Sequence, residues 1–441
     1  MFGPLINRTY RHLLAAQLLS LLGTGLATVA LGLLAYELAG ADAGAVLGTA
    51  FAIKMVAYVG IAPVAGAFVH LVPRRALLVA LDVLRAAVAM ALPFVTEIWQ
   101  VYVLIFVLQA GSAVFTPTFQ ATIPDILPDE AEYTKALSLS RLAYDLESLA
   151  SPAIAAALLG LVGFHWLFAG NALGFLASAA LVMTVALPSP KPPTTQEGAW
   201  GRITRGARIY LATPRLRGLL ALNVTVAAAG AMVIVNTVVL VRAQFGLGAA
   251  EVGWTLAAYG LGSMAAALIL PRLLDGVLTD RTAMLAGAGL LVTGLVLGPL
   301  VQDWGAALPL WAMLGLGNGL VLTPSGRLLR RSSRPGDRPA LFAAQFALSH
   351  ACWLVAYPVA GLLGAAAGLN ATFLVLAALA ASGFLAALAL WPRPDVQQIE
   401  HVHHGLAPGH AHRLDVRPEP AGGFRHSHAF VIDEDHPHWP R

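Results

Sequence analysis

Long apolar stretches recur along this chain and are separated by short segments rich in charged residues, proline and glycine. An apolar stretch of about 18 or more residues is long enough to cross the hydrocarbon core of a bilayer as a helix. The pattern therefore predicts an all-α membrane protein with twelve transmembrane helices, at about residues 12–37, 44–70, 76–95, 99–123, 134–162, 165–187, 216–241, 250–271, 282–302, 305–327, 340–367 and 369–391.

The composition agrees with this prediction. Apolar residues make up 58% of the chain and charged residues 11%, whereas a soluble domain carries roughly 25% charged residues. Glycine and alanine are spread through the spans, as expected where small residues let helices pack closely in lipid. The segments between the spans leave no room for a soluble catalytic domain, so the protein is not expected to be an enzyme.

Basic residues in the loops fall almost entirely on one side of the twelve-span arrangement. The opposite side has only Arg242, whereas the basic side carries Arg8, Arg11, Arg74, Arg75, Lys135, Arg141, Lys191, Arg202, Arg205, Arg208, Arg215, Arg217, Arg272, Arg281, Arg327, Arg330, Arg331, Arg334 and Arg338. Short positively charged loops stay in the cytoplasm, so we expect a multi-pass protein of the inner (plasma) membrane with both termini cytoplasmic. The same loops explain the pI of about 9.4 without a nucleic-acid partner.

The chain shows signs of an internal duplication. Thr116-Pro117 recurs as Thr323-Pro324, and Ser151-Pro152 recurs as Tyr357-Pro358, at offsets of 207 and 206 residues. We therefore expect two pseudo-symmetric six-helix halves, although chance placement of prolines is the alternative. The predicted domains are an N-terminal half, a linker, a C-terminal half and a tail, at residues 1–188, 189–215, 216–392 and 393–441.

The linker opens with a proline-rich run and continues with Arg202, Arg205 and Arg208. These arginines are spaced like one face of a helix. The spacing predicts a helix that lies on the inner surface of the membrane.

Nine of the 13 histidines lie in the tail that follows the last span. Most are arranged as His-x-His pairs: His401, His403, His404, His410, His412, His426, His428, His436 and His438. Imidazole has an unperturbed pKa near 6.5, so a neutral ring nitrogen is available to a borderline divalent metal at cytoplasmic pH. The proline and glycine content indicates a flexible segment, and the alternative is a solvated basic tail that binds no metal.

The plan of two six-helix halves resembles the major facilitator superfamily, secondary transporters whose halves rock around a central site. The loop Gly66-Ala-Phe-Val-His70-Leu-Val-Pro73-Arg74-Arg75 is similar to the superfamily signature Gly-x-x-x-Asp-Arg-x-Gly-Arg-Arg. His70 replaces the acid of the signature, and Pro73 replaces its second glycine. The resemblance implies a gate motif that includes Gly66, His70, Arg74 and Arg75 but lacks the acid of its usual charge clasp.

A narrower resemblance rests on residues 115–125 and 136–152, which are similar to the exporter branch that includes macrolide-type and enterobactin exporters. Within this branch, the His-rich tail and residues 349–358 are similar to nickel-resistance exporters of the NreB type. The resemblance implies export coupled to protons. The sequence contains no Gly-x-x-x-x-Gly-Lys-Ser/Thr loop of an ATPase.

In the superfamily, spans 1, 4, 7 and 10 line the cavity. Here these spans carry polar residues, in spans 1 and 4 at steps of three and four that keep them on one helix face: Gln17, Ser20, Thr24, Thr28, Gln109, Ser112, Thr116, Gln120, Asn223, Asn236, Asn318 and Thr323. No carboxylate accompanies them, which predicts a neutral polar path. Hydrogen bonding between packed helices is the alternative explanation.

Charged residues inside the spans are costly in lipid and are candidates for transport or proton coupling: Lys54, Asp82, Arg85, Asp145 and Glu147. Asp82 and Arg85 match an Asp-x-x-Arg that often follows the superfamily signature. Asp145 lies four residues after Arg141, so an ion pair on one helix is an alternative explanation for it. Glu147 has no such partner and is the preferred carboxylate. Lys54 could pair with Glu147 or with Asp82.

The 206-residue offset relates Tyr144 to His350, so Asp145 and Glu147 are expected at the depth of His350 and Cys352. His350 and Cys352 lie two residues apart, about 200° around a helix, so at most one could bind a given ion. His350 is a candidate for metal or proton binding, with packing as the alternative.

Three functions follow from these patterns. The first is a proton-coupled exporter of a divalent metal, nickel or cobalt, with the metal as substrate and tail ligand and no tightly bound cofactor. The second is an exporter of a drug or siderophore. The third is a membrane metal sensor or storage protein without transport. Protons, the metal and the bilayer are the expected partners of a monomer.

Overall fold

The computed structural model describes residues 2–39, 43–159, 161–188, 198–274, 278–393, 398–403, 417–418, 424–432, 436 and 439. Its long helices are α1 (Arg8–Ala39), α2 (Ala43–Phe68), α3 (Arg74–Ala91), α4 (Ile98–Ile126), α5 (Glu130–Leu159), α6 (His165–Met183), α7 (Ala199–Ala212), α8 (Pro214–Val238), α9 (Ala249–Leu274), α10 (Asp280–Leu297), α11 (Trp304–Leu322), α12 (Ser325–Arg331) and α13 (Arg338–Leu390). Short helical turns are η1 (Gly3–Ile6), η3 (Val69–Leu71), η4 (Leu92–Phe94), η5 (Val239–Gln244) and η6 (Gly298–Leu300).

Ten helices within the described ranges are long and apolar enough to cross a membrane. One of them, α13, has 53 residues, about 80 Å at 1.5 Å per residue, which is far longer than one crossing requires. Gly368 interrupts it at φ 79°, a conformation that favours glycine, so α13 consists of two helices that turn back on each other. Together with α5, whose charged residues lower its hydropathy, these helices match the predicted all-α spans.

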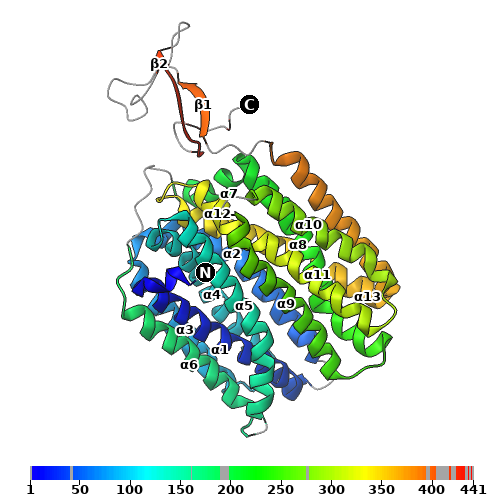
Figure 1. Ribbon diagram of the computed structural model, residues 1–441. Coiled ribbons are helices and arrows are strands. Elements are labelled where there is room, and N and C mark those ends of the chain that lie inside the picture. Colours follow the sequence, from blue (N-terminus) through cyan, green and yellow to red (C-terminus); the bar gives the residue numbers. More distant parts are fainter. Residues whose placement is uncertain are drawn as a thin grey trace.

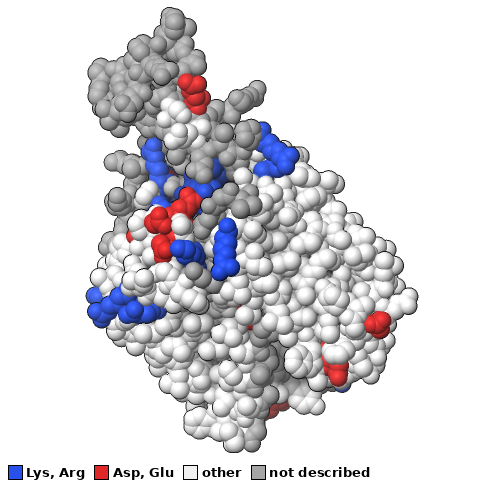
Figure 2. Space-filling model, viewed as in Figure 1, with Lys and Arg blue, Asp and Glu red and all other residues white. Residues whose placement is uncertain are grey.

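The helices form two bundles that lie side by side (Figure 1). In the first, α1 packs on α5 and α6, and α3 and α4 complete the bundle; in the second, α8 packs on α13 and α9 packs on α11. The bundles meet where α2 and α4 contact α13 and where α5 contacts α9. Lys and Arg gather at one end of the molecule, above a broad belt without charge (Figure 2). We call this end the arginine-rich end.

The linker contains the predicted surface helix, α7, which buries Ile209 and Tyr210 and exposes Trp200 and Arg208. It lies at the arginine-rich end and packs on α13 and α2. Arg205, one of the three arginines predicted to share a face of this helix, is buried and pairs with Asp337.

The tail contains strands that the sequence pattern does not predict. β1 (Gln398–His403), β2 (Arg417–Pro418) and β3 (Phe424–Ala429) form an antiparallel sheet in the order β1-β3-β2. After β3 the chain returns to the second bundle, where Phe430 and Ile432 join the buried core and the Arg215 guanidinium lies 5.1 Å from the Trp439 ring centroid. The expectation of an entirely flexible tail is therefore wrong for these segments, because the strands pair with one another and Phe430 and Ile432 are buried against the second bundle.

Glycines set the spacing of α9 and α11. A Cβ at Gly315 would collide with the backbone carbonyl of Tyr259, and a Cβ at Gly262 would collide with that of Ala312. The two backbones therefore touch, as in other membrane helix pairs that use small residues at their contact.

We predict that Gly315→Ala destabilises the protein by about 1–3 kcal/mol, the usual cost of overpacking, because α9 and α11 must move apart. The matched control is Gly289→Ala on α10, where an added Cβ meets nothing within 4 Å. Thermal unfolding in detergent should show a lower Tm for the first variant and an unchanged or higher Tm for the second. Equal Tm values would contradict the backbone contact.

Candidate functional site

A cluster of polar and aromatic side chains lies between the two bundles. The Tyr58 hydroxyl on α2 donates a 2.8 Å hydrogen bond to Gln109 Oε1 on α4. The Tyr58 ring centroid lies 4.8 Å from that of Phe346 and 4.8 Å from that of His350, both on α13. We call Lys54, Tyr58, Gln109, Phe346 and His350 the central cluster. It combines a cation, an amide and aromatic faces at the surface where the bundles must separate.

Lys54 connects the central cluster with Glu147. Its Nζ lies 5.6 Å from the Tyr58 ring centroid and interacts electrostatically with both Glu147 and His350. The Glu147 carboxylate borders Gly25, where an added Cβ would lie 2.6 Å from Oε1. Of the two partners considered for Lys54, the structure brings it to Glu147. Residues from α2, α5 and α13 therefore share one charged neighbourhood.

His350 is held by its own helix. Its Nδ1 lies 2.6 Å from the Phe346 carbonyl oxygen, and its ring centroid lies 4.2 Å from that of Phe346. Cys352 Sγ donates to the Leu348 carbonyl at 3.4 Å. His350 Nδ1 and Cys352 Sγ are thus each hydrogen-bonded to a carbonyl of the preceding helical turn, so the two atoms are not directed toward a shared ion.

Asp145 forms the ion pair that its spacing predicts. Arg141 Nη2 lies 2.8 Å from Asp145 Oδ1, and Arg141 Nε donates a 2.8 Å hydrogen bond to Ser263 Oγ on α9. The pair therefore joins α5 to the second bundle.

Asp82 and Arg85 lie inside the first bundle. Asp82 is fully buried, pairs with Arg85 and accepts a 2.7 Å hydrogen bond from Ser178 Oγ on α6. The Arg85 guanidinium lies between two rings, 4.0 Å from the Phe115 centroid and 4.3 Å from the Phe175 centroid. Cation–π contacts of this kind stabilise a desolvated arginine. This arrangement joins α3, α4 and α6.

The predicted polar stripes separate into two groups. Gln17 Oε1 accepts a 3.1 Å hydrogen bond from Ser140 Oγ, and Thr24 and Ser112 bond to carbonyls of their own helices. Thr116 is partly exposed. In the second bundle Asn223 and Asn318 are buried, and Asn223 Nδ2 donates to the Leu219 carbonyl at 3.0 Å. Asn236 Nδ2 donates to the Ala360 carbonyl on α13 at 3.2 Å. Members of both groups therefore form hydrogen bonds within and between helices, the alternative explanation for these stripes.

A network of ion pairs closes the arginine-rich end. Asp125, at the end of α4, accepts a 2.6 Å bond from Arg74 Nη1 in its own bundle and pairs with Arg338 of α13 in the other. Gly66 allows α2 to approach α13 here, because a Cβ would lie 2.6 Å from Ala343 Cβ. Arg75 is exposed. Asp125 thus joins the two bundles, although His70 occupies the position where the superfamily signature has an acid.

A second set of pairs lies beside Asp125. Arg327 Nη2 lies 2.7 Å from Glu130 Oε1, and Arg331 pairs with the same carboxylate. Asp280 at the start of α10 forms an ion pair with Arg327 at 3.1 Å and accepts a 2.6 Å hydrogen bond from Arg331 Nη1. We call Asp125, Glu130, Asp280, Arg327, Arg331 and Arg338 the latch. The latch was not predicted; the signal that could have revealed it is the acids after span 4, which lie on the same predicted face as an arginine-rich loop.

The tail histidines lie only partly within the described ranges. His401 and His403 are in β1, and His426 and His428 are in β3. His436 is buried, with its ring centroid 4.7 Å from that of Phe430. His404, His410, His412 and His438 lie outside the described residues. Among the described residues, no three His, Cys, Asp or Glu side chains are arranged to hold a metal ion.

The family follows from a direct match along most of the chain. The family model described as transmembrane secretion effector, part of the major facilitator superfamily, matches residues 1–325. The chain belongs to this family. It is therefore a transporter with the fold that the sequence resemblance implies.

Known relatives agree with this assignment. The chain is 27% identical over 301 residues to the uncharacterized MFS-type transporter YfiS of Bacillus subtilis, covering 63% of this chain and 70% of the relative. It is 26% identical over 136 residues to macrolide efflux protein A of Enterococcus faecalis, covering 30% of this chain and 42% of that protein. The matched segment thus spans less than half of the macrolide protein.

Among solved structures, the human organic anion transporter MFSD10 superposes with a TM-score of 0.73 at 14% identity, covering 86% of this chain and 99% of that one. This likeness shows the fold alone.

We predict that Asp125→Asn opens the arginine-rich end, because Arg74 and Arg338 lose the carboxylate that they share. Removing one partly buried partner costs about 1–2 kcal/mol, roughly a 5- to 30-fold change in the closed-to-open ratio. Spin labels introduced by Leu71→Cys and Arg217→Cys in a Cys352→Ser background would report the change as a longer distance.

Asp129→Asn is the matched control. Asp129 caps α5 by accepting from the Glu132 N–H at 2.9 Å, and asparagine caps equally well. Indistinguishable distance distributions for the two variants would exclude a latch centred on Asp125.

Proposed function

We propose that this protein is a secondary active exporter that moves an amphipathic organic compound out of the cytoplasm in exchange for protons. The proposal rests on the position and composition of the central cluster, which lies between the two bundles. Its aromatic rings and neutral amide suit an apolar ligand with polar groups, since binding pockets for organic molecules are mostly apolar with a few polar contacts. Its described ligand atoms do not suit a multidentate metal site. The macrolide efflux relative supports the same class of cargo.

Glu147 is the proposed proton carrier. Arg141 pairs with Asp145 and not with Glu147, whose carboxylate interacts electrostatically with Lys54 of the central cluster. Neutralising the carboxylate would release Lys54 from its counter-charge. Proton binding at Glu147 therefore changes the charge of the surface where the bundles meet, which links protonation to the change between the two access states.

The arginine-rich end is proposed to face the cytoplasm of the inner membrane, in keeping with the positive-inside rule. With this orientation the latch is the inner gate. Cargo enters from the cytoplasm only when the Arg338–Asp125 ion pair breaks. The latch therefore contributes to the free energy that is needed to open the inner gate.

We predict that Glu147→Gln abolishes proton-driven accumulation of a fluorescent macrolide in everted membrane vesicles while leaving its binding intact. The amide cannot exchange a proton, whereas the aromatic contacts remain. The matched control is Glu37→Gln, which removes an exposed carboxylate at the end of α1. Accumulation in the Glu147 variant at the level of the unmodified protein would rule out this residue as the coupling site.

Export of a divalent metal, nickel or cobalt, is the second candidate, and the His-rich tail favours it. β1 pairs with β3 so that His401 lies opposite His426, and His403 and His428 lie two residues along the same strands. Alternate strand residues share a face, so the four positions belong to one face of the sheet. Imidazole nitrogens bind borderline metals, nickel and copper among them.

We predict that the full chain binds nickel in equilibrium dialysis and that a chain ending at Pro394 does not, because the removed segment holds the histidine pairs. Proteoliposome flux then separates the roles. Nickel binding by the tail without nickel flux would fit an accessory or sensor role. Nickel binding that persists in the truncated chain would indicate that the metal site lies in the helical bundles.

A further inference from the structure

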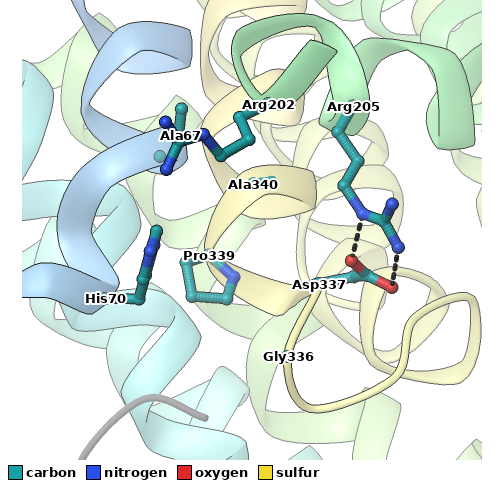
Figure 3. A pocket seen from close by; sticks show the side chains of 9 residues that line it. Ala67, His70, Arg202, Arg205, Gly336, Asp337, Pro339 and Ala340 are labelled. Carbon is teal, nitrogen blue, oxygen red and sulfur yellow. Dashed lines mark hydrogen bonds and ion pairs between the residues drawn. The ribbon is translucent and has the colours of Figure 1, made fainter. Parts of the chain in front are cut away.

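A pocket at the arginine-rich end is formed by three elements from different parts of the chain. Gly66 comes from the end of α2 and His70 from η3, the turn that continues it; Arg202 and Arg205 come from α7, and Asp337 and Ala340 from the start of α13 (Figure 3). Gly206 also holds α7 tightly on α13, because a Cβ there would collide with the Ala340 carbonyl. The pocket therefore exists only while α2 of the first bundle and α13 of the second lie together.

The charges of this pocket are unequal. Arg205 uses both its Nε, at 2.6 Å, and its Nη2, at 3.3 Å, to bind the two carboxylate oxygens of Asp337. That pair is neutral as a unit. Arg202 and His70 remain on the other side of the pocket, with Arg205 turned away from them (Figure 3).

Arg202 has donors that the described protein groups do not use. Its guanidinium lies 5.0 Å from the Phe68 ring centroid, and its Nε is buried without a hydrogen-bond partner. The position where the superfamily signature places an acid is occupied by His70, which lines the pocket. The signature acid could have neutralised the Arg202 guanidinium, but this chain has the imidazole of His70 at that position.

The surroundings of the pocket are those of a membrane interface. α7 exposes Trp200 to the extent of 75%, and indole rings are enriched at the level of lipid headgroups. The helix is amphipathic, with Ile209 and Tyr210 buried beneath it. Arginine binds phosphate through a planar fork of donors, and basic pockets between membrane helices bind anionic headgroups.

We propose that the pocket between α2, α7 and α13 binds the phosphate of an anionic phospholipid headgroup through Arg202 and His70. The bound lipid bridges the two bundles at the same end as the latch. Because it can bind in this way only when the arginine-rich end is closed, it stabilises the closed state and makes inner-gate opening sensitive to lipid composition. This proposal concerns lipid and is independent of the exported cargo.

The test uses the full chain in nanodiscs of phosphatidylcholine with increasing phosphatidylglycerol. We expect phosphatidylglycerol to raise the Tm of the unmodified protein. Arg202→Gln should weaken the apparent affinity for phosphatidylglycerol about tenfold, the loss expected for one charge-assisted hydrogen bond. His70→Asp should weaken it as well, because it returns an acid to the pocket. Arg217→Gln, which removes an exposed arginine outside the pocket, is the matched control.

Three results would overturn the proposal. An unchanged phosphatidylglycerol response in both pocket variants would exclude this site. An equal loss in Arg217→Gln would indicate a diffuse charge effect. Inorganic phosphate that raises the Tm in pure phosphatidylcholine, and whose effect Arg202→Gln removes, would assign the site to a free anion in place of a lipid.

Discussion

Guanidinium–carboxylate pairs that neither bundle can form alone hold this transporter closed at one end. Asp125 receives one arginine from its own bundle and one from the other, and Glu130 receives two arginines from the second bundle. Such pairs are partly exposed, so each contributes modestly, but a network adds geometric specificity. If the two halves rock against each other, the contact between them must be strong enough to populate the closed state and weak enough to break when that end opens. A network whose members are in part buried, such as Arg327, and in part exposed, such as Glu130, meets both requirements.

Charges deeper in the bundles divide into two kinds. Asp82 and Arg85 are satisfied inside one bundle by each other, by Ser178 and by two aromatic rings. Their ion pair need not break when the halves move. Lys54, Glu147 and His350 instead come from α2, α5 and α13 and meet across the boundary between the bundles. We propose that the second kind, which lies where the bundles meet, is where coupling takes place.

The spans could be predicted because lipid imposes length and apolarity on every crossing helix. The 340–367 and 369–391 spans are separated by Gly368 even though α13 runs as one long element, and the ion pair of Arg141 with Asp145 follows from helical spacing. The latch could not be predicted as a set of pairs, because Asp125 and Arg338 are 213 residues apart in sequence. The tail strands were missed because their alternating histidines carry no apolar pattern, whereas Phe430 and Ile432, which dock the segment, follow the strands.

We propose that an organic molecule, and not a metal ion, crosses between the bundles in exchange for protons. The most direct measurement is flux in proteoliposomes with an imposed pH gradient, comparing a labelled macrolide with radioactive nickel in the same preparation. The account predicts macrolide movement that collapses when an ionophore removes the gradient, with nickel at the level of empty liposomes. Gradient-dependent nickel flux without macrolide movement would contradict it.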